Sequence, residues 1–154
     1  MSSTPMFDPN TFASMTYTES NSTESIPVPA QTYPAIIDSK KLEQWQKKDG
    51  SASGMKLIVN WLVTDPSVKE ITGREKNIVR QDIMLDLTEA GMLDMGKGMN
   101  VQLGRLRAAV GLNVPGEPFG FDMLGGRQAM IQVGHRAGEK PGEIYAEVKA
   151  VASM

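Results

Sequence analysis

The chain has 154 residues, of which 40% are hydrophobic and 22% charged, and a formal net charge of -2. The absence of cysteine excludes disulfide scaffolds, thiolate metal sites and cysteine nucleophiles, and a single histidine, His135, excludes a multi-histidine metal site. The near-neutral charge excludes a whole-protein field that concentrates nucleic acid, so any basic surface must come from local sorting of charges.

The first 30 residues predict an extended, Ser/Thr-rich N-terminal arm, followed by one domain over residues 31–154. The apolar residues of the arm stand singly, and the arm carries three carboxylates but no Lys or Arg. Such a stretch buries too little surface to offset its ordering entropy. We expect the arm to be disordered or to order against a partner through Phe7, Phe12 and Tyr17.

Three strands are predicted next, because apolar and polar residues alternate along three segments. The segments run from Tyr33 to Trp45, from Met55 to Val63 and from Ile78 to Leu87. An Asp49-Gly50 turn joins the first two as a hairpin. A polar connection, residues 66–77, separates the second and third. One face of the second strand is wholly apolar and predicts the core, with Leu57, Val59, Trp61 and Val63.

One helix and two further strands complete the predicted order. A glycine-rich stretch, residues 91–98, precedes an apolar stripe at helical spacing, formed by Met99, Leu103, Leu106 and Val110. The last two strands, residues 129–136 and 144–151, form a hairpin around the loop 138–142. The order predicts a mainly β fold: a five-stranded antiparallel barrel resembling the OB-fold, with one helix between the third and fourth strands.

No catalytic constellation is found, and we expect a non-enzymatic protein without cofactor or metal. Residues 91–97 match the spacing of a phosphate-binding loop, but Gly98 stands where the motif needs a Ser or Thr hydroxyl for magnesium. Antiparallel hairpins also surround the loop, in place of parallel crossovers. Carboxylates four residues apart on one strand lie about 13 Å apart, too far for acid–base partnership.

A basic outer face is the feature that indicates function. Three neighbouring predicted strands each place one cation on this face: Lys40 on the first, Lys56 on the second and Arg80 on the third. Asn60 lies between these cations. A bulge in the first strand would turn Lys40 away and leave Lys41 in its place. This pattern indicates phosphate binding along the sheet.

The first hairpin adds an aromatic ring among cations. Residues 40–56 have a local charge of +3, with Lys47 and Lys48 at the turn and Trp45 between two glutamines. Lysines neutralise phosphates, and an exposed indole stacks on a base. The alternative is equally open: Trp45 folds back onto the barrel while the lysines keep the hairpin soluble. Arg136 and Tyr145 of the last hairpin are secondary candidates, because that loop borders the OB-fold binding cleft.

The sequence resembles a phage family of single-stranded-DNA-binding proteins with an OB-fold, formerly a domain of unknown function. The resemblance covers about residues 27–151 and rests on segments that are structural more than chemical. They are Pro27–Ile37, Asp49-Gly50-Ser51, Met55–Val63, Ile83–Thr88, Leu103–Leu106 and Val110–Leu112. It implies binding of single strands in phage DNA replication or recombination. Many single-strand binders end in an acidic tail that recruits replication partners, whereas this chain ends with Lys149–Met154, so we do not expect recruitment by such a tail.

We therefore expect a single-stranded-DNA-binding protein that also accepts RNA as a candidate ligand, forms a homo-oligomer and contacts phage replication proteins. No stretch approaches twenty apolar residues and no secretory signal is found, so we expect no membrane contact and a location in the host cytoplasm. The alternative is a phage virion protein, for capsid decoration or cement, that clasps a neighbour with its arm.

Overall fold

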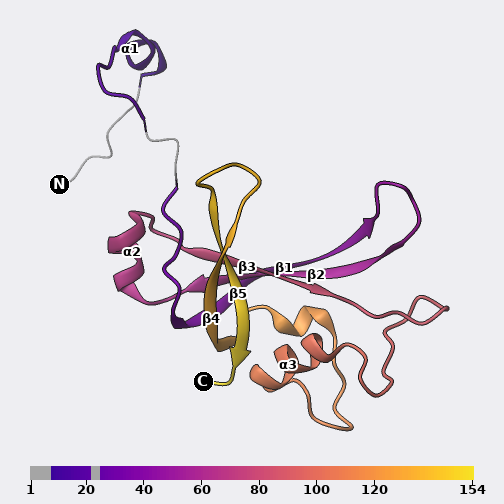
Figure 1. The fold of residues 1–154 in the computed structure, drawn as a ribbon. Helices are drawn as coiled ribbons and strands as arrows, with labels where there is room; N and C mark the ends of the chain where they lie inside the picture. Colours follow the sequence, from indigo (N-terminus) through magenta and orange to yellow (C-terminus); the bar gives the residue numbers. More distant parts are fainter. Residues whose placement is uncertain (1–7, 22–24) are drawn as a thin grey trace.

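The computed structural model describes residues 8–21 and 25–154. Its sheet consists of β1 (Thr32–Gln46), β2 (Ser53–Val63), β3 (Ile78–Met84), β4 (Gln128–Ala137) and β5 (Ile144–Ala152). The strands pair in the order β1-β2-β3-β5-β4, and β4 pairs again with β1, so the sheet closes in a ring (Figure 1). The five predicted strands are thus confirmed.

The prediction of a wholly antiparallel sheet is wrong, because β3 and β5 run parallel. The other four neighbouring pairs in the ring are antiparallel. Strand direction cannot alternate throughout a ring with an odd number of strands, so one neighbouring pair must be parallel. This pair, which we call the β3–β5 seam, has a single ladder partnership, Arg80 opposite Glu147.

In the described part of the chain, three α-helices accompany the ring: α1 (Pro9–Ser14), α2 (Pro66–Thr72) and α3 (Val101–Ala109), with a 3₁₀ turn at Phe121–Leu124. The predicted helix between the third and fourth strands is confirmed as α3, but Met99 of the predicted apolar stripe precedes the helix and is 41% exposed. In Figure 1 it lies below the ring, whereas the β1–β2 and β4–β5 hairpins both project upward. This arrangement leaves the outer sheet surface between the two hairpins uncovered by α3.

Helix α2 was not predicted, although its end signals are present in the sequence. Asp65 caps it by accepting a hydrogen bond from the Ser67 amide at 2.9 Å, Pro66 begins it, and Gly73 ends it with φ +75°. The helix has only seven residues and one buried side chain, Val68. A helix this short has no room for an apolar repeat, so periodicity could not reveal it.

The core lies inside the ring, and the predicted apolar face of β2 is confirmed. Leu57, Val59 and Trp61 are 0% exposed. The Trp61 indole Nε1–H donates a hydrogen bond of 2.9 Å to the Gln81 side-chain oxygen on β3, so its one polar atom is satisfied. Leu103 and Leu106 of α3 close the same core.

Residues 25–29, within the predicted arm, pack against the ring; we call this segment the strap. Val28 is 1% exposed, and its carbonyl oxygen lies 2.7 Å from His135 Nε2 on β4. The Tyr33 hydroxyl donates to the Pro29 carbonyl at 2.8 Å. The only histidine therefore has a structural contact. Further toward the N-terminus, α1 buries none of its residues, and the predicted contact residue Phe7 lies outside the described residues.

Trp61→Phe should lower the free energy of unfolding by about 1–3 kcal/mol, because it removes indole volume and leaves the Gln81 oxygen without its donor. Urea unfolding followed by circular dichroism measures the difference. Val114→Ala, at a side chain that is 51% exposed, is the control and should change stability by less than about 0.5 kcal/mol. Equal stability of Trp61→Phe and the parent chain would contradict the assigned core role.

Candidate nucleic-acid interface

A bulge in β1 decides which lysine reaches the outer face of the sheet. Ile37 pairs with Trp61, but Ser39 pairs with Asn60, so Asp38 is the extra residue. Beyond the bulge, Lys41 pairs with Ile58 on the outer face, while Lys40 pairs with Val59 on the core side. Of the two alternatives, the structure thus has Lys41 on the predicted face.

Lys40 belongs to a different environment. Its Nζ lies 2.7 Å from the Asp122 carboxylate in the 3₁₀ turn, and this ion pair lowers the pKa of Asp122. Sequence reasoning gave no sign of this partner, because 82 residues separate the two positions. Lys40 therefore helps to fix the 3₁₀ turn beside β1 and does not join the outer cations.

Ladder partners on β1, β2 and β3 share the outer face, so the register defines it. The rows across these strands are Ser39–Asn60–Arg80, Lys41–Ile58–Asp82 and Glu43–Lys56–Met84. Across the seam, Arg80 lies opposite Glu147, and Arg136 pairs with Tyr145 one ladder pair before the β4–β5 loop. We call this surface, from Trp45 to Tyr145, the outer face.

Every cation of the outer face has a carboxylate partner. Asp82 accepts hydrogen bonds of 2.6 Å and 3.0 Å from the Arg80 guanidinium, and Lys56 Nζ lies 3.6 Å from it. The hydrogen bonds from Arg80 are the main cause of a lowered Asp82 pKa, and the same contact raises the pKa of Arg80. The Glu147 carboxylate lies 3.5 Å from Arg136 Nε and also forms an ion pair with Lys149. Lys41 lies 3.9 Å from Glu43.

The outer face nevertheless keeps an excess of positive charge. Its cations are Lys41, Lys56, Arg80, Arg136 and Lys149, against Glu43, Asp82 and Glu147. Lys149 was missed, although alternation from Tyr145 through Glu147 places it on this side. Its alkyl chain lies over Gly134, where an added Cβ would come within 2.6 Å of it.

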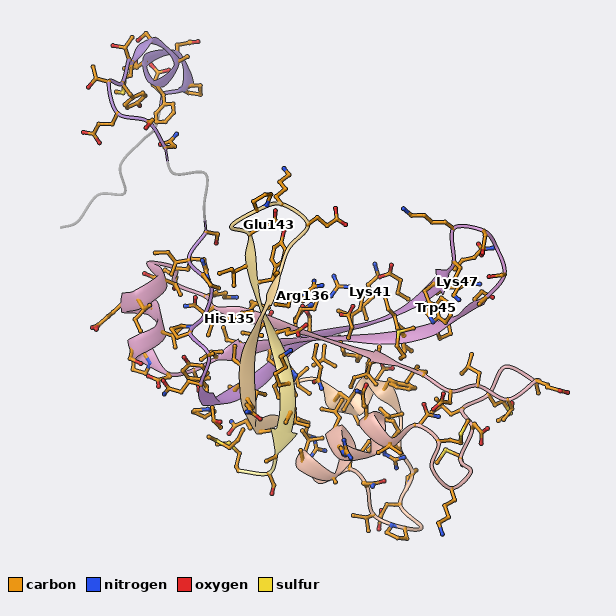
Figure 2. The ribbon with its side chains drawn as sticks, in the orientation of Figure 1. Lys41, Trp45, Lys47, His135, Arg136 and Glu143 are labelled. Carbon is orange, nitrogen blue, oxygen red and sulfur yellow. The ribbon has the colours of Figure 1, made fainter. Side chains whose placement is uncertain are left out.

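Lys47 and Lys48 stand at the exposed tip of the β1–β2 hairpin. No ion pair within residues 8–21 and 25–154 involves either of them. The predicted Asp49-Gly50 turn is confirmed: Asp49 accepts from the Ser51 amide and hydroxyl, and Gly50 has φ +74°. Figure 2 shows Lys41, Trp45 and Lys47 along this hairpin. These two lysines are the cations at the tip that can meet a phosphate without first leaving a carboxylate.

The apolar and amide groups of the outer face differ in availability. Ile58 is 6% exposed although it faces outward, with Lys41 and Asp82 as its ladder neighbours, so it is not open to a ligand. Met84 is 50% exposed. The Asn60 amide donates one hydrogen bond to the Ser39 hydroxyl at 3.0 Å, which leaves its carbonyl oxygen and its second N–H without a partner among the described residues.

Trp45 lies on the backbone of its cross-strand partner Gly54. A Cβ at Gly54 would come within 2.9–3.0 Å of three indole atoms, so only glycine accommodates this ring position. The indole is half-buried, and its Nε1 is covered without a hydrogen-bond partner among the described residues. An unmade hydrogen bond of a covered donor costs about 1–3 kcal/mol. This cost lowers the free energy needed to lift the ring from Gly54.

Tyr145 is the second aromatic of the outer face. It is 45% exposed, and the Arg136 guanidinium carbon lies 5.5 Å from its ring centroid. In the ladder, Tyr145 is about eight residues from Trp45 along the strand direction, which corresponds to about 26 Å. Two partly exposed rings therefore lie at opposite ends of a face that carries net positive charge.

Comparison with known proteins names no family for this chain, so a functional assignment depends on this geometry. No protein-family model matches the chain, and a search of curated proteins gave no match. Within residues 8–21 and 25–154, no cluster of three His, Asp or Glu side chains is arranged to hold a metal ion. No helix in the same ranges is both long and apolar enough to cross a membrane.

Gly54→Ala should displace Trp45 from the hairpin, because the new methyl group would overlap the indole. Tryptophan emission should shift to longer wavelength and become more sensitive to acrylamide quenching, while buried Trp61 continues to emit as before. Gly104→Ala is the matched control, since a Cβ there meets nothing within 4 Å, and it should leave the spectrum unchanged. An unaltered spectrum in Gly54→Ala would contradict the described Trp45 position.

Proposed function

We propose that this chain is a non-enzymatic single-stranded-DNA-binding protein, and that its ring of strands is an OB-fold barrel. The strand order and the helix between β3 and β4 support the OB-fold. The outer face spans β2 and β3 and lies between the β1–β2 and β4–β5 loops, which is where OB-folds bind oligonucleotides. The resemblance of the sequence to phage single-strand binders suggests a role in phage DNA replication or recombination.

The observation that carries the proposal is the pairing of aromatic rings with cations on one face. Trp45 and Tyr145 offer flat surfaces on which bases of any sequence stack, and Lys41, Lys47 and Lys48 offer phosphate contacts beside Trp45. A duplex keeps its bases stacked inside, so rings at the ends of the face favour unpaired strands. The same chemistry accepts single-stranded RNA, which is therefore a second ligand to test.

Carboxylates on the outer face oppose this binding and limit its strength. Exposed ion pairs contribute about 0–1 kcal/mol each, so a phosphate can replace a carboxylate beside Arg80 or Arg136 at small cost. The displaced carboxylate stays near the strand, however, and repels it. We infer moderate affinity with strong dependence on salt and little dependence on base sequence.

Trp45→Ala should weaken binding to oligo-dT by about 1–3 kcal/mol, the contribution of one base–aromatic stack. Charge reversal of Lys47 and Lys48 should reduce the slope of log K against log salt by about 0.7 for each phosphate that is no longer neutralised. Fluorescence anisotropy of a labelled strand of about 16 nucleotides, at several salt concentrations, measures both. Arg105→Glu on α3 is the control for charge reversal and should leave binding nearly unchanged. Failure of the parent chain to bind at low salt would refute the function, and full binding by both variants would refute the site.

Asp82→Asn should strengthen binding, because it frees Arg80 and Lys56 and removes a negative charge from the path of the strand. A gain of roughly 0.5–1 kcal/mol corresponds to removal of the competing exposed ion pairs. The same anisotropy titration measures it. Glu75→Gln removes a carboxylate that pairs with Lys69, which belongs to α2, and should have no effect. Weaker binding by Asp82→Asn would show that Asp82 supports the interface.

A further inference from the structure

An open groove of about 730 Å³ lies beside the β3–β5 seam, between the strap and the β4–β5 hairpin. Arg80 and Glu147 form the single ladder pair of the seam, and the residues that precede them in β3 and β5 are not paired with each other. The groove lies where these two strand beginnings separate. Exposed apolar side chains line it from both strands: Ile78 is 39% exposed, Ile144 50% and Tyr145 45%. Arg74 and Lys140 add two cations to its lining, against one carboxylate, Glu143.

The N-terminal arm complements this groove, because it carries exposed apolar side chains and negative charge. Phe12, Met15 and Tyr17 are 60%, 53% and 69% exposed, and α1 buries none of its residues. Among residues 8–21 and 25–154, the side chains of residues 8–17 form hydrogen bonds within their own segment only. Asp8 and Glu19 are its charges, and no Lys or Arg occurs before residue 31. The chain's own ring thus leaves three large apolar side chains of an acidic segment uncovered.

We propose that the segment Asp8–Glu19 of one copy docks in this groove of a second copy, so that two copies exchange arms. Apolar side chains of the arm would cover Ile78 and Ile144, and Asp8 or Glu19 would lie near Arg74 and Lys140. Reciprocal exchange satisfies both grooves and both arms through one two-fold operation, the commonest symmetry of homo-oligomers. This inference concerns assembly and does not rest on DNA binding.

The root of the arm is already fixed at the rim of the groove. The Arg74 guanidinium donates to the Ser25 hydroxyl at 3.1 Å, and buried Val28 holds the strap. An arm that leaves one rim is therefore presented beside the opening into which a partner's arm would enter.

Because the chain has no cysteine, a disulfide can form only between cysteines that are introduced, and disulfide trapping can test the docking directly. Tyr17→Cys and a size-tagged Ile144→Cys are prepared separately in the full chain, mixed and oxidised, then separated on a non-reducing gel. We expect a disulfide between the two proteins at least fivefold above that of Tyr17→Cys mixed with Met92→Cys. Met92 is 68% exposed and lies in the loop after β3, so it reports random collision.

Two results would overturn the proposal. One is cross-linking no greater than with the Met92→Cys control. The other is an intramolecular disulfide in the Tyr17→Cys/Ile144→Cys double variant at high dilution, which would show that each arm occupies its own groove. Sedimentation provides a second test: Lys140→Glu should weaken the dimer at least threefold, and Glu19→Lys should restore it. A monomeric parent chain at all concentrations also excludes the exchange, whereas loss of DNA binding leaves it intact.

Discussion

The odd number of strands in the closed ring is the constraint on which the rest of the structure depends. Five strands cannot alternate in direction around a ring, so a parallel neighbour pair is unavoidable. The chain places it between β3 and β5, where one ladder pair, Arg80 opposite Glu147, joins the strands. The face and the groove both follow from this junction. On one side of it the strands bring Arg80, Glu147 and Arg136 together, and on the other side they part and leave an open groove.

Local patterns predicted much of the fold, because each strand and α3 has a repeat long enough to read. The inward face of β2 followed from period two, and Leu103 and Leu106 followed from helical spacing. The parallel seam could have been derived from the predicted closure and the strand count alone. Helix α2 escaped, because Asp65 and Gly73 mark only its ends and seven residues hold no repeat.

The sequence indicated which residue types could form the candidate interface, but it did not indicate the ion-pair partners and neighbours of these residues. The sequence allowed a bulge that exchanges Lys40 for Lys41, but a bulge is a feature of pairing between strands and cannot be located from one strand. The contact of Lys40 with Asp122 and the position of Trp45 on Gly54 likewise depend on register. The position of Lys149 on the outer face could have been predicted, because the alternation of side chains along the last strand places Tyr145, Glu147 and Lys149 on the same side.

The carboxylates of the outer face have a physical reason that is separate from ligand binding. Without Asp82 and Glu147, the cations Arg80, Arg136, Lys56 and Lys149 would lie on adjacent strands with Glu43 as the one carboxylate left among their ladder neighbours, and like charges on neighbouring strands destabilise a sheet. Their stabilising effect is greatest around the seam, which has the fewest backbone hydrogen bonds to resist repulsion. The proposed binding face has to be stable when empty and cationic when occupied, so it needs partners that hold each cation weakly. Exposed carboxylates on the same strand or its neighbour, as Asp82 is to Arg80 and Lys56, meet that requirement.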